Sequence, residues 1–254
     1  MIFDSHAHYD DEQFEEDREA LLSSFKEQGV GYVVNISASL SSVEDSIELA
    51  KEYPFIYTSV GVHPEEVHHL KEDSEAYLRK MADYEKCVAI GEIGLDYHRK
   101  EVPHDLQKKW FITQMDIARD KKLPILIHSR DAAQDTLNIM REQHAEEIGG
   151  VIHCFSYSKE MAAKYLEMGF YLGIGGVVTF KNAKTLKEVV EYAPLESLLL
   201  ETDCPYLAPE PYRGKRNNSL YIKYVAEQIA QLKGVTYEEV VSVTEQNAKK
   251  MYGI

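Results

Sequence analysis

The chain opens with the stretch Ile2-Phe3-Asp4-Ser5-His6-Ala7-His8, an apolar run that closes on two histidines. Such a run predicts a β-strand, and side chains two residues apart lie on the same face of a strand. His6 and His8 therefore point toward one place. Two imidazoles that converge in this way are typical of a metal site, so the end of the first strand is expected to supply two ligands.

Four later apolar runs close in the same manner, on a histidine or a carboxylate. Imidazole and carboxylate are groups that bind divalent first-row metal ions. One such residue at one strand end would mean little, but the same position on five runs favours a single shared site. The expected ligands are His6, His8, Glu92, His128, His153 and Asp203.

Apolar, β-branched runs alternate with amphipathic stretches along the chain, which predicts a parallel sheet with helices between its strands. Eight strands are expected, near residues 2–8, 31–38, 55–62, 87–93, 123–128, 150–154, 169–175 and 197–202. Helical patterns fit residues 11–28, 43–52, 104–121, 131–143, 159–168, 182–192, 219–232 and 236–252.

This alternation favours a (β/α)8 TIM barrel, in which catalytic residues lie at the C-terminal ends of several strands. All six expected ligands hold that position. A doubly wound open sheet is the alternative, but it would gather ligands at one switch point and not on five strands. The run from Gly173 to Gly176 lacks the lysine of a phosphate-binding loop, so it is expected to mark tight packing at a strand end.

The composition is that of an ordinary globular protein. Of 254 residues, 44% are hydrophobic and 28% are charged, and no linker interrupts them, so one domain over residues 1–254 is expected. The first residues show no basic stretch followed by an apolar segment, and no apolar run reaches about 18 residues. These features favour a soluble cytoplasmic protein that engages no membrane, and none indicates a stable protein partner.

Cysteine usage and net charge add two constraints. Three cysteines without a C-x-x-C pair argue against a disulfide framework and a thiolate zinc site. Cys154 and Cys204 directly follow His153 and Asp203, and strand neighbours face opposite sides, so both are expected to be buried structural thiols. The net charge of −15 disfavours a broad nucleic-acid surface. Metal ions, however, supply local positive charge that can hold a phosphate.

The ligand set predicts the chemistry of the site. Six ligands exceed what one tetrahedral ion accepts with a position left for water, so two divalent ions are expected. Glu92 is the candidate for a bridge between them, and Asp203 is the candidate for both ligand and general base. Four imidazoles favour Zn²⁺, Mn²⁺, Co²⁺ or Ni²⁺ over Mg²⁺, which prefers carboxylate and water.

Further polar residues are candidates for substrate contact. His63 follows an apolar run and Arg130 lies beside His128, so both are expected to line the pocket. After the last strand, residues 211–218 carry three cations in an otherwise acidic chain. Such cations suit phosphates, and nearby tyrosines can stack on bases, although a solvated surface is the alternative. The three cations are Arg213, Lys215 and Arg216.

With these residues in view, the whole chain resembles the TatD family of metal-dependent deoxyribonucleases, a branch of the amidohydrolase-like barrels. The resemblance rests on ordered motifs: Asp4-Ser5-His6-Ala7-His8, Gly61-Val62-His63-Pro64, Gly91-Glu92-Ile93-Gly94-Leu95-Asp96-Tyr97, His128-Ser129-Arg130, His153-Cys154-Phe155, Glu201-Thr202-Asp203-Cys204-Pro205-Tyr206 and Arg213-Gly214-Lys215-Arg216-Asn217. It implies a (β/α)8 fold, the same six ligands, and 3′ to 5′ exonuclease activity on DNA, with single strands as the expected substrate. It also implies use of Mg²⁺, which the four imidazoles do not favour.

One departure and two alternatives accompany this resemblance. The family usually continues the last motif with Glu-Pro, whereas this chain has Asn218-Ser219. The change bears on substrate preference, since the ligands are intact. Related members are described as deacylases of D-aminoacyl-tRNA, so hydrolysis of a carbonyl ester or amide is the alternative activity. A metal-binding module without catalysis is a third hypothesis, which an incomplete ligand set would have favoured.

Overall fold

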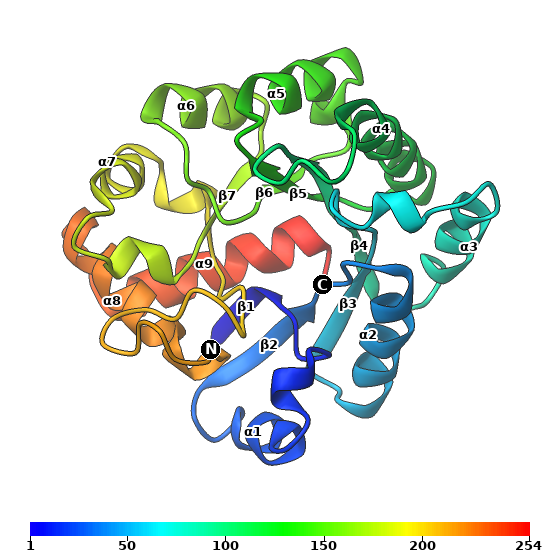
Figure 1. Cartoon of the computed structure of the whole chain (residues 1–254). Coiled ribbons are helices and arrows are strands. Elements are labelled where there is room, and N and C mark those ends of the chain that lie inside the picture. The colour runs from blue at the N-terminus through cyan, green and yellow to red at the C-terminus, as the bar shows by residue number, and fades with distance from the viewer.

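Eight parallel strands form one sheet, and each strand pairs with the next in chain order. The computed structural model describes residues 1–254. Figure 1 shows the strands at the centre with the helices around them. The strands are β1 (Ile2–Ala7), β2 (Val30–Asn35), β3 (Ile56–Val60), β4 (Cys87–Asp96), β5 (Ile125–Arg130), β6 (Gly150–Ile152), β7 (Tyr171–Ile174) and β8 (Leu198–Leu200).

Helices connect the strands and cover the outside of the sheet. They are α1 (Arg18–Ser24), α2 (Leu40–Glu52), α3 (Ser74–Met81), α4 (His104–Lys121), α5 (Ala133–Glu142), α6 (Lys159–Glu167), α7 (Lys184–Tyr192), α8 (Ile222–Lys233) and α9 (Tyr237–Tyr252). None is long and apolar enough to cross a membrane. Strand and helix thus alternate as in a (β/α)8 barrel.

The sheet curls until its first and last strands meet. Beyond β8, the backbone amides of Thr202 and Asp203 donate to the carbonyl of His6 at 3.3 and 2.9 Å, and the amide of His8 donates to the carbonyl of Cys204 at 2.9 Å. This closure brings Asp203, at the end of the chain's last strand, beside the histidines of its first. The barrel expectation is therefore confirmed.

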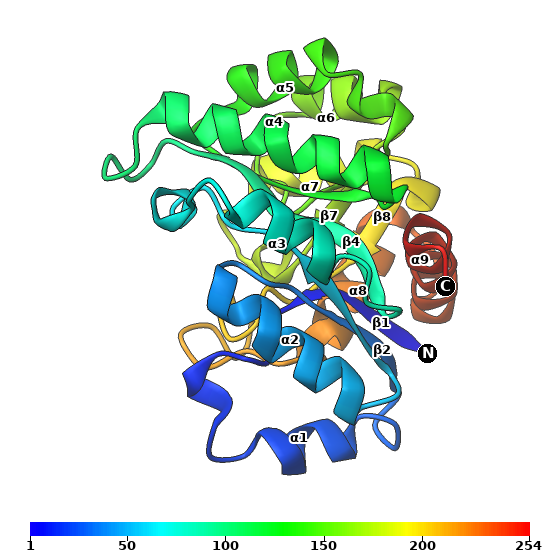
Figure 2. The same cartoon turned by 90° about the vertical axis from the view of Figure 1, so that its right-hand side faces the viewer.

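The inside of the barrel has an apolar lower layer. Leu126, Val151 and Leu199 belong to a buried cluster with Phe3 and the C-terminal helix residue Tyr252. Figure 2 shows α9 at the end of the barrel where both chain termini lie. The hydroxyl of Tyr252 donates to the carbonyl of Ser5 at 2.7 Å, which fixes that helix to β1. The barrel is thus filled at this end, and polar side chains can gather only at the other.

The strand pattern also fixes what lies in the upper layer. Leu126 and Val151 stand two residues before His128 and His153, so each pair shares a strand face. The two histidines therefore lie directly above apolar residues of the barrel interior. Both stand at the C-terminal ends of their strands, the end where barrel enzymes place catalytic groups.

The secondary structure differs from expectation in two places. Residues 11–28 divide into a 3-10 turn at Glu12–Phe14 and the short helix α1, because the side chain of Asp11 caps the turn first. Helix α3 was not expected: it has only two turns, and a window of that length carries little periodicity. Both lie outside the sheet and leave the positions of the strand ends unchanged.

Candidate metal centre

The two histidines of β1 converge as expected. The Nε2 atoms of His6 and His8 are 3.2 Å apart, and both rings are largely buried. The other ring nitrogen of His8 lies 2.9 Å from the carbonyl oxygen of Ile36, which orients the ring. Two imidazole nitrogens this close share either a proton or a cation.

Asp203 completes this half of the centre from β8. Its Oδ1 lies 3.4 Å from Nε2 of His8 and 3.8 Å from Nε2 of His6. The residue has a left-handed backbone with φ of 57°, a conformation that Asp tolerates better than most residues. The turn after β8 thus directs the carboxylate back toward β1.

Glu92 of β4 faces the four histidines expected as ligands with its two carboxylate oxygens. Its Oε2 lies 3.5 Å from Nε2 of His6 and 4.0 Å from Nε2 of His8. Its Oε1 lies 2.7 Å from Nδ1 of His128 and 3.5 Å from Nε2 of His153. One carboxylate therefore faces β1 with one oxygen and the fifth and sixth strands with the other.

Two of these spacings are those of donors to one metal ion. Two donors that each lie about 2.1 Å from one ion are about 3.0–3.4 Å apart for octahedral and tetrahedral angles. The spacing of the His6 and His8 nitrogens falls in this range, and that between His8 and Asp203 reaches its upper limit. All six side chains expected as ligands thus gather at the C-terminal ends of the strands, with donor atoms suited to divalent ions. Which of them bind an ion remains a prediction.

Outer carboxylates orient two of the histidines. Oδ2 of Asp96 lies 2.9 Å from Nε2 of His128, and Oε1 of Glu201 lies 3.2 Å from Nδ1 of His153. Neither carboxylate was among the six expected ligands. Glu201 carried no separate signal, because β8 ends at Leu200 and the backbone turns at Asp203, so strand alternation does not relate these two residues.

A glycine near the end of β7 makes room for Glu201. A Cβ atom on Gly173 would lie 2.1 Å from Oε2 of Glu201, a spacing that no side chain could accept. On Gly176 it would lie 2.1 Å from the carbonyl oxygen of Leu207, whereas at Gly175 the nearest atom is 3.5 Å away. The expectation of tight packing is confirmed for the first and last of these glycines.

Burial and charge act together on the titration of the site. Burial disfavours charge on His128, but hydrogen bonds with Asp96 and Glu92 outweigh it and raise the pKa of this imidazole to about 9. The pKa of Glu92 is held well below its usual value because His153 and His128 outweigh the effect of burial. Burial and the nearby His128 lower the pKa of His63 to about 3. Glu92 is therefore ionised and His63 neutral at physiological pH.

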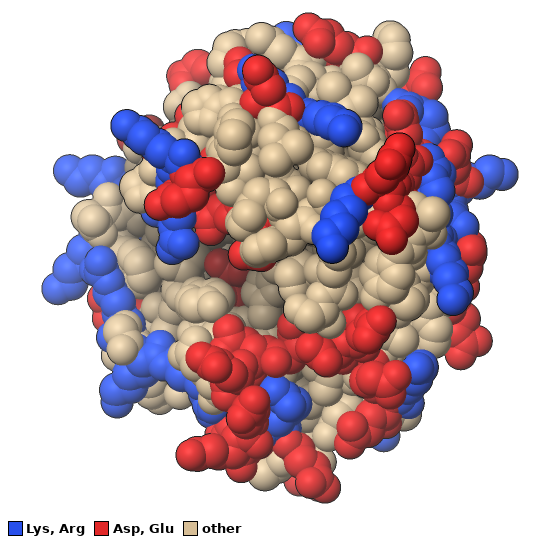
Figure 3. Space-filling view, turned by 45° about the vertical axis from the view of Figure 1, so that its right-hand side comes forward, with Lys and Arg blue, Asp and Glu red and all other residues tan.

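The donors open into a pocket of about 590 Å³. Seven carboxylates and two arginines line it, and Figure 3 shows acidic side chains in and beside a hollow of the surface. His63 lies here as expected, with Nε2 3.9 Å from Oε1 of Glu92, and so does Arg130. Arg99 also lines the pocket and was missed, because it lies in a loop beyond the strand pattern.

The three loop cations do not share one environment. Arg213 lies over the ring of Phe180 at 4.3 Å, and neither it nor Lys215 forms an ion pair. Arg216 differs, because both terminal nitrogens bind the carboxylate of Asp17, at 2.8 and 2.6 Å. Its guanidinium is thus engaged by the protein, and its contact with substrate stays a prediction.

Cys154 also departs from expectation. Strand β6 ends at Ile152, so the alternation of faces does not extend to Cys154, which has a φ of 45°. Its sulfur lies within 4.8 Å of donor atoms of His153 and Asp203 and is not fully buried. Cys87 and Cys204 are buried, as expected for the latter.

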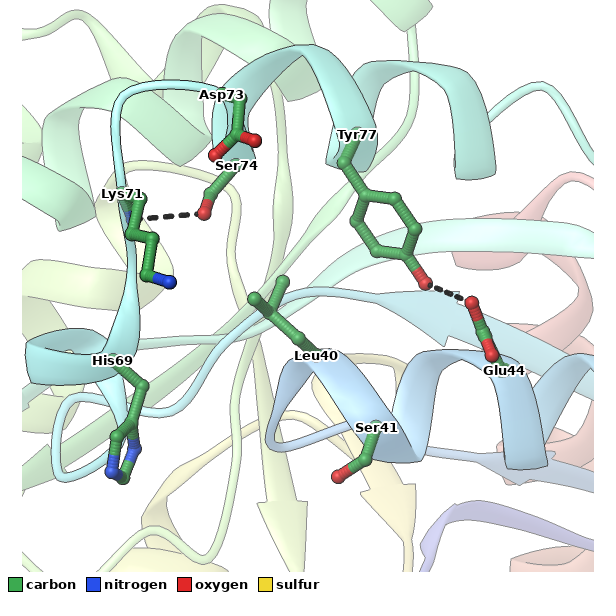
Figure 4. Close-up of a pocket in the computed structure, with 8 residues that line it drawn as sticks. All are labelled: Leu40, Ser41, Glu44, His69, Lys71, Asp73, Ser74 and Tyr77. Carbon is green, nitrogen blue, oxygen red and sulfur yellow. Dashed lines mark hydrogen bonds between the residues drawn. The ribbon is translucent and has the colours of Figure 1, made fainter.

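A separate hollow lies between α2 and α3 and shares no residue with the metal pocket. Figure 4 shows Tyr77 of α3 pointing toward Glu44 of α2, and its hydroxyl donates to that carboxylate at 3.0 Å. Ser74 accepts from the amide of Lys71 at 2.9 Å. Both hydrogen bonds join residues of the hollow's own wall, so we assign it no ligand.

Comparison with known proteins agrees with this geometry. The family described as TatD related DNase matches residues 3–253. The uncharacterized metal-dependent hydrolase YabD of Bacillus subtilis is 46% identical over 254 residues and covers all of both chains. A Rahnella protein named 3′-5′ ssDNA/RNA exonuclease TatD is 30% identical over 248 residues, 95% of this chain and 94% of that protein.

Solved structures of family members share the fold as well. The crystal structure of YJJV, a TatD homologue from Escherichia coli, superposes with a TM-score of 0.94 at 27% identity and covers 100% of this chain and 98% of that one. The match to the family extends over all strands that carry the six donors. This chain therefore belongs to the TatD family of metal-dependent hydrolases.

Proposed function

We propose that this protein hydrolyses phosphodiester bonds of single-stranded DNA with the aid of two divalent ions and shortens the strand from its 3′ end. The observation that carries the proposal is the position of Glu92, whose two oxygens face different histidines. A carboxylate so placed is the bridge of two-metal hydrolases. The first ion is assigned to His6, His8 and Asp203, and the second to His128 and His153, with Glu92 shared.

Bound there, two divalent ions would polarise a phosphoryl oxygen and lower the pKa of a water molecule. The chain itself supplies the acceptor for the water's proton. The side chain of Asp203 is 18% exposed toward the pocket, whereas that of Glu92 is 4% exposed. Nearby histidines, His8 foremost, outweigh burial and lower the pKa of Asp203, so its carboxylate is ionised at neutral pH. Asp203 therefore takes the proton, and Glu92 holds the centre together.

Two other residues orient the phosphate. Arg130 lines the pocket without an ion pair, so its planar guanidinium is free to bind two phosphate oxygens. His63 is neutral and donates or accepts a hydrogen bond without adding charge. The 3′ to 5′ direction and the single-stranded substrate are taken from the name of the Rahnella relative.

A second candidate activity is hydrolysis of a carbonyl ester such as an aminoacyl-tRNA. The observation in its favour is the pocket rim, where Asp10, Asp11, Glu65 and Glu66 add four carboxylates that the metal assignment does not use. Carboxylates attract an ammonium group, which an aminoacyl ester carries and a DNA strand lacks.

The test is degradation of end-labelled single-stranded DNA by metal-free protein resupplied with Mg²⁺, Mn²⁺ or Zn²⁺. Metal-dependent shortening from the 3′ end is expected, with no shortening by Asp203→Asn, which keeps the shape of the side chain and tolerates the left-handed backbone. If protein with bound metal leaves DNA intact but releases the amino acid from D-aminoacyl-tRNA, the ester activity replaces the nuclease.

A further inference from the structure

A second pocket adjoins the metal pocket and shares part of its wall. It has a volume of about 520 Å³, and Tyr206 and Leu207 line both pockets. The remaining lining comes mostly from the segment between β8 and α8, with one residue each from the loops after β1 and β7. We call it the β8–α8 pocket; its lining is Gln13, Phe180, Pro205, Tyr206, Leu207, Ala208, Arg213, Gly214, Lys215 and Arg216.

The shared wall is apolar and exposed. Only four large hydrophobic side chains of the whole chain are exposed, and Tyr206 and Leu207 are two of them, at 52% and 38%. Leu207 also has a φ of 53°, a left-handed conformation that is unfavourable for a non-glycine residue. An exposed aromatic ring beside an exposed aliphatic side chain suits a planar, partly apolar group such as a nucleobase.

The charge of the β8–α8 pocket is opposite to that of its neighbour. Arg213 and Lys215 carry no ion pair, while the adjoining metal pocket holds seven carboxylates. A polyanion that leaves the metal centre is repelled by that rim and attracted to these two cations. Figure 3 shows basic side chains beyond the acidic hollow on one side of the surface.

The wall and the loop are held in place by the protein. The hydroxyl of Tyr206 donates to Oδ2 of Asp11 at 3.0 Å, and the side chain of Asn217 donates to the carbonyl of Tyr206 at 2.9 Å. The ion pair between Arg216 and Asp17 fixes the far end of the loop. The β8–α8 pocket is therefore preformed, and its loop loses less conformational entropy when a ligand binds.

We propose that the β8–α8 pocket binds the nucleotide next to the scissile phosphodiester, with its base against Tyr206 and its phosphate on Arg213 and Lys215. This rests on the proposed function and deepens it, because the enzyme then requires a strand of at least two nucleotides and discriminates against small diesters. Cation–π contact with Phe180 keeps the Arg213 guanidinium at the pocket.

The first test compares an eight-nucleotide single strand with bis(p-nitrophenyl) phosphate, a diester that has no second phosphate to meet Arg213 and Lys215. For Arg213→Ala/Lys215→Ala, the loss of kcat/KM on the strand is expected to exceed the loss on the small diester by about tenfold or more. Lys80→Ala/Lys250→Ala removes equal charge from exposed positions near the opposite end of the barrel and is the matched control. Equal losses on both substrates would overturn the proposal.

The second test separates binding from hydrolysis. A fluorescent phosphorothioate strand, which resists cleavage, is titrated into each metal-loaded variant and followed by anisotropy. Tyr206→Ala should weaken binding by about tenfold, and Tyr206→Phe, which keeps the ring, should bind nearly as wild type does. Weakening by Arg213→Ala/Lys215→Ala and Tyr206→Ala supports the pocket even if no DNA is cleaved, in which case only the nuclease assignment fails. Wild-type affinity in both variants overturns the pocket.

Discussion

The hydroxyl of Ser219 donates a hydrogen bond of 2.6 Å to Oδ2 of Asp4, a carboxylate that is fully buried beneath the metal centre. Asp4 in turn accepts bonds from the hydroxyl and amide of Thr202 at 2.7 and 3.1 Å, and from the amide of His6 at 3.3 Å. Ser219 thus supports Asp4, and Asp4 in turn links β1, which carries His6, to the turn that carries Asp203. The serine stands where the family usually has proline, which offers neither hydroxyl nor amide hydrogen.

Replacement of Ser219 is therefore expected to destabilise the protein. Ser219→Ala leaves a buried carboxylate short of one donor, which costs about 1–3 kcal/mol of unfolding free energy. Ser219→Pro should lower the unfolding free energy further, because the hydrogen bond that the backbone amide of Ser219 donates to the hydroxyl of Tyr9 at 2.8 Å is lost as well. Urea denaturation measures both, with Ser23→Ala on the exposed face of α1 as control. If Ser219→Ala is as stable as that control, the support role is wrong.

Metal binding should release protons. The pKa values of His8, His128 and His153 are each raised to about 9, because facing carboxylates outweigh burial. An ion binds only unprotonated imidazole, so affinity should rise between pH 6 and pH 9, by about tenfold per pH unit for each proton displaced. Calorimetry in buffers of different ionisation enthalpy counts these protons. An affinity that is flat over this range would contradict the charge state assigned to the site.

The same raised pKa values make the stability of the metal-free protein depend on pH. The native protein without metal binds protons on these histidines that the unfolded chain releases above about pH 6.5. Their contribution to stability is fully present below that pH and is lost as the pH rises through about 9. Thermal unfolding of the metal-free protein should therefore shift to lower temperature between pH 7 and pH 9, and His8→Asn/His128→Asn should flatten this dependence. An unchanged slope in that variant would exclude these two histidines as its source.

Asp96 is expected to tune the metal through His128. Asp96→Asn keeps the shape of the side chain but weakens the 2.9 Å contact with Nε2 of the histidine. Loss of such an outer partner typically lowers metal affinity 10–100-fold. The control is Asp131→Asn, which makes the same change at an exposed pair with His98 separated by 3.0 Å. Equal metal affinity in the two variants would exclude the role of Asp96.

Gly173 should be essential because Glu201 occupies the space beside it. Gly173→Ala forces a methyl group onto the carboxylate and displaces the partner of His153, so metal affinity should fall at least tenfold. Gly175→Ala meets only ordinary contacts and is the matched control. Metal titration by competition with a chromophoric chelator measures the difference. If the two alanine variants bind metal alike, Glu201 does not orient His153.

Sequence periodicity predicted the barrel and the places of its strand ends, because a buried strand must be apolar. The candidate ligands were then the polar residues that close these apolar runs. The six donors could be named for the same reason: strand ends of a closed barrel meet at one face. The residues that hold them could not be found this way. Asp4 and Glu201 lie inside apolar runs, where a lone carboxylate carries no periodic signal. The partners of Asp4 come from the other end of the chain, and that of Glu201 comes from the turn after β6.

Two other differences have local causes. The alternation rule assigned Cys154 to the outer face, but the strand had already ended and the backbone turned. The three loop cations looked equivalent in sequence, yet Arg216 meets Asp17 only because the turn after β1 folds against this loop. Contacts between loops of distant strands depend on the tertiary structure and cannot be predicted from a local sequence pattern.

Six side chains are proposed to hold two divalent ions, with Glu92 between them. The number of bound ions is measured by inductively coupled plasma mass spectrometry of protein reconstituted with Zn²⁺ or Mn²⁺ and then desalted. Two ions are expected per wild-type chain and one in His128→Ala, which leaves the site of His6, His8 and Asp203 intact. One ion per wild-type chain, or two in His128→Ala, would contradict this proposal.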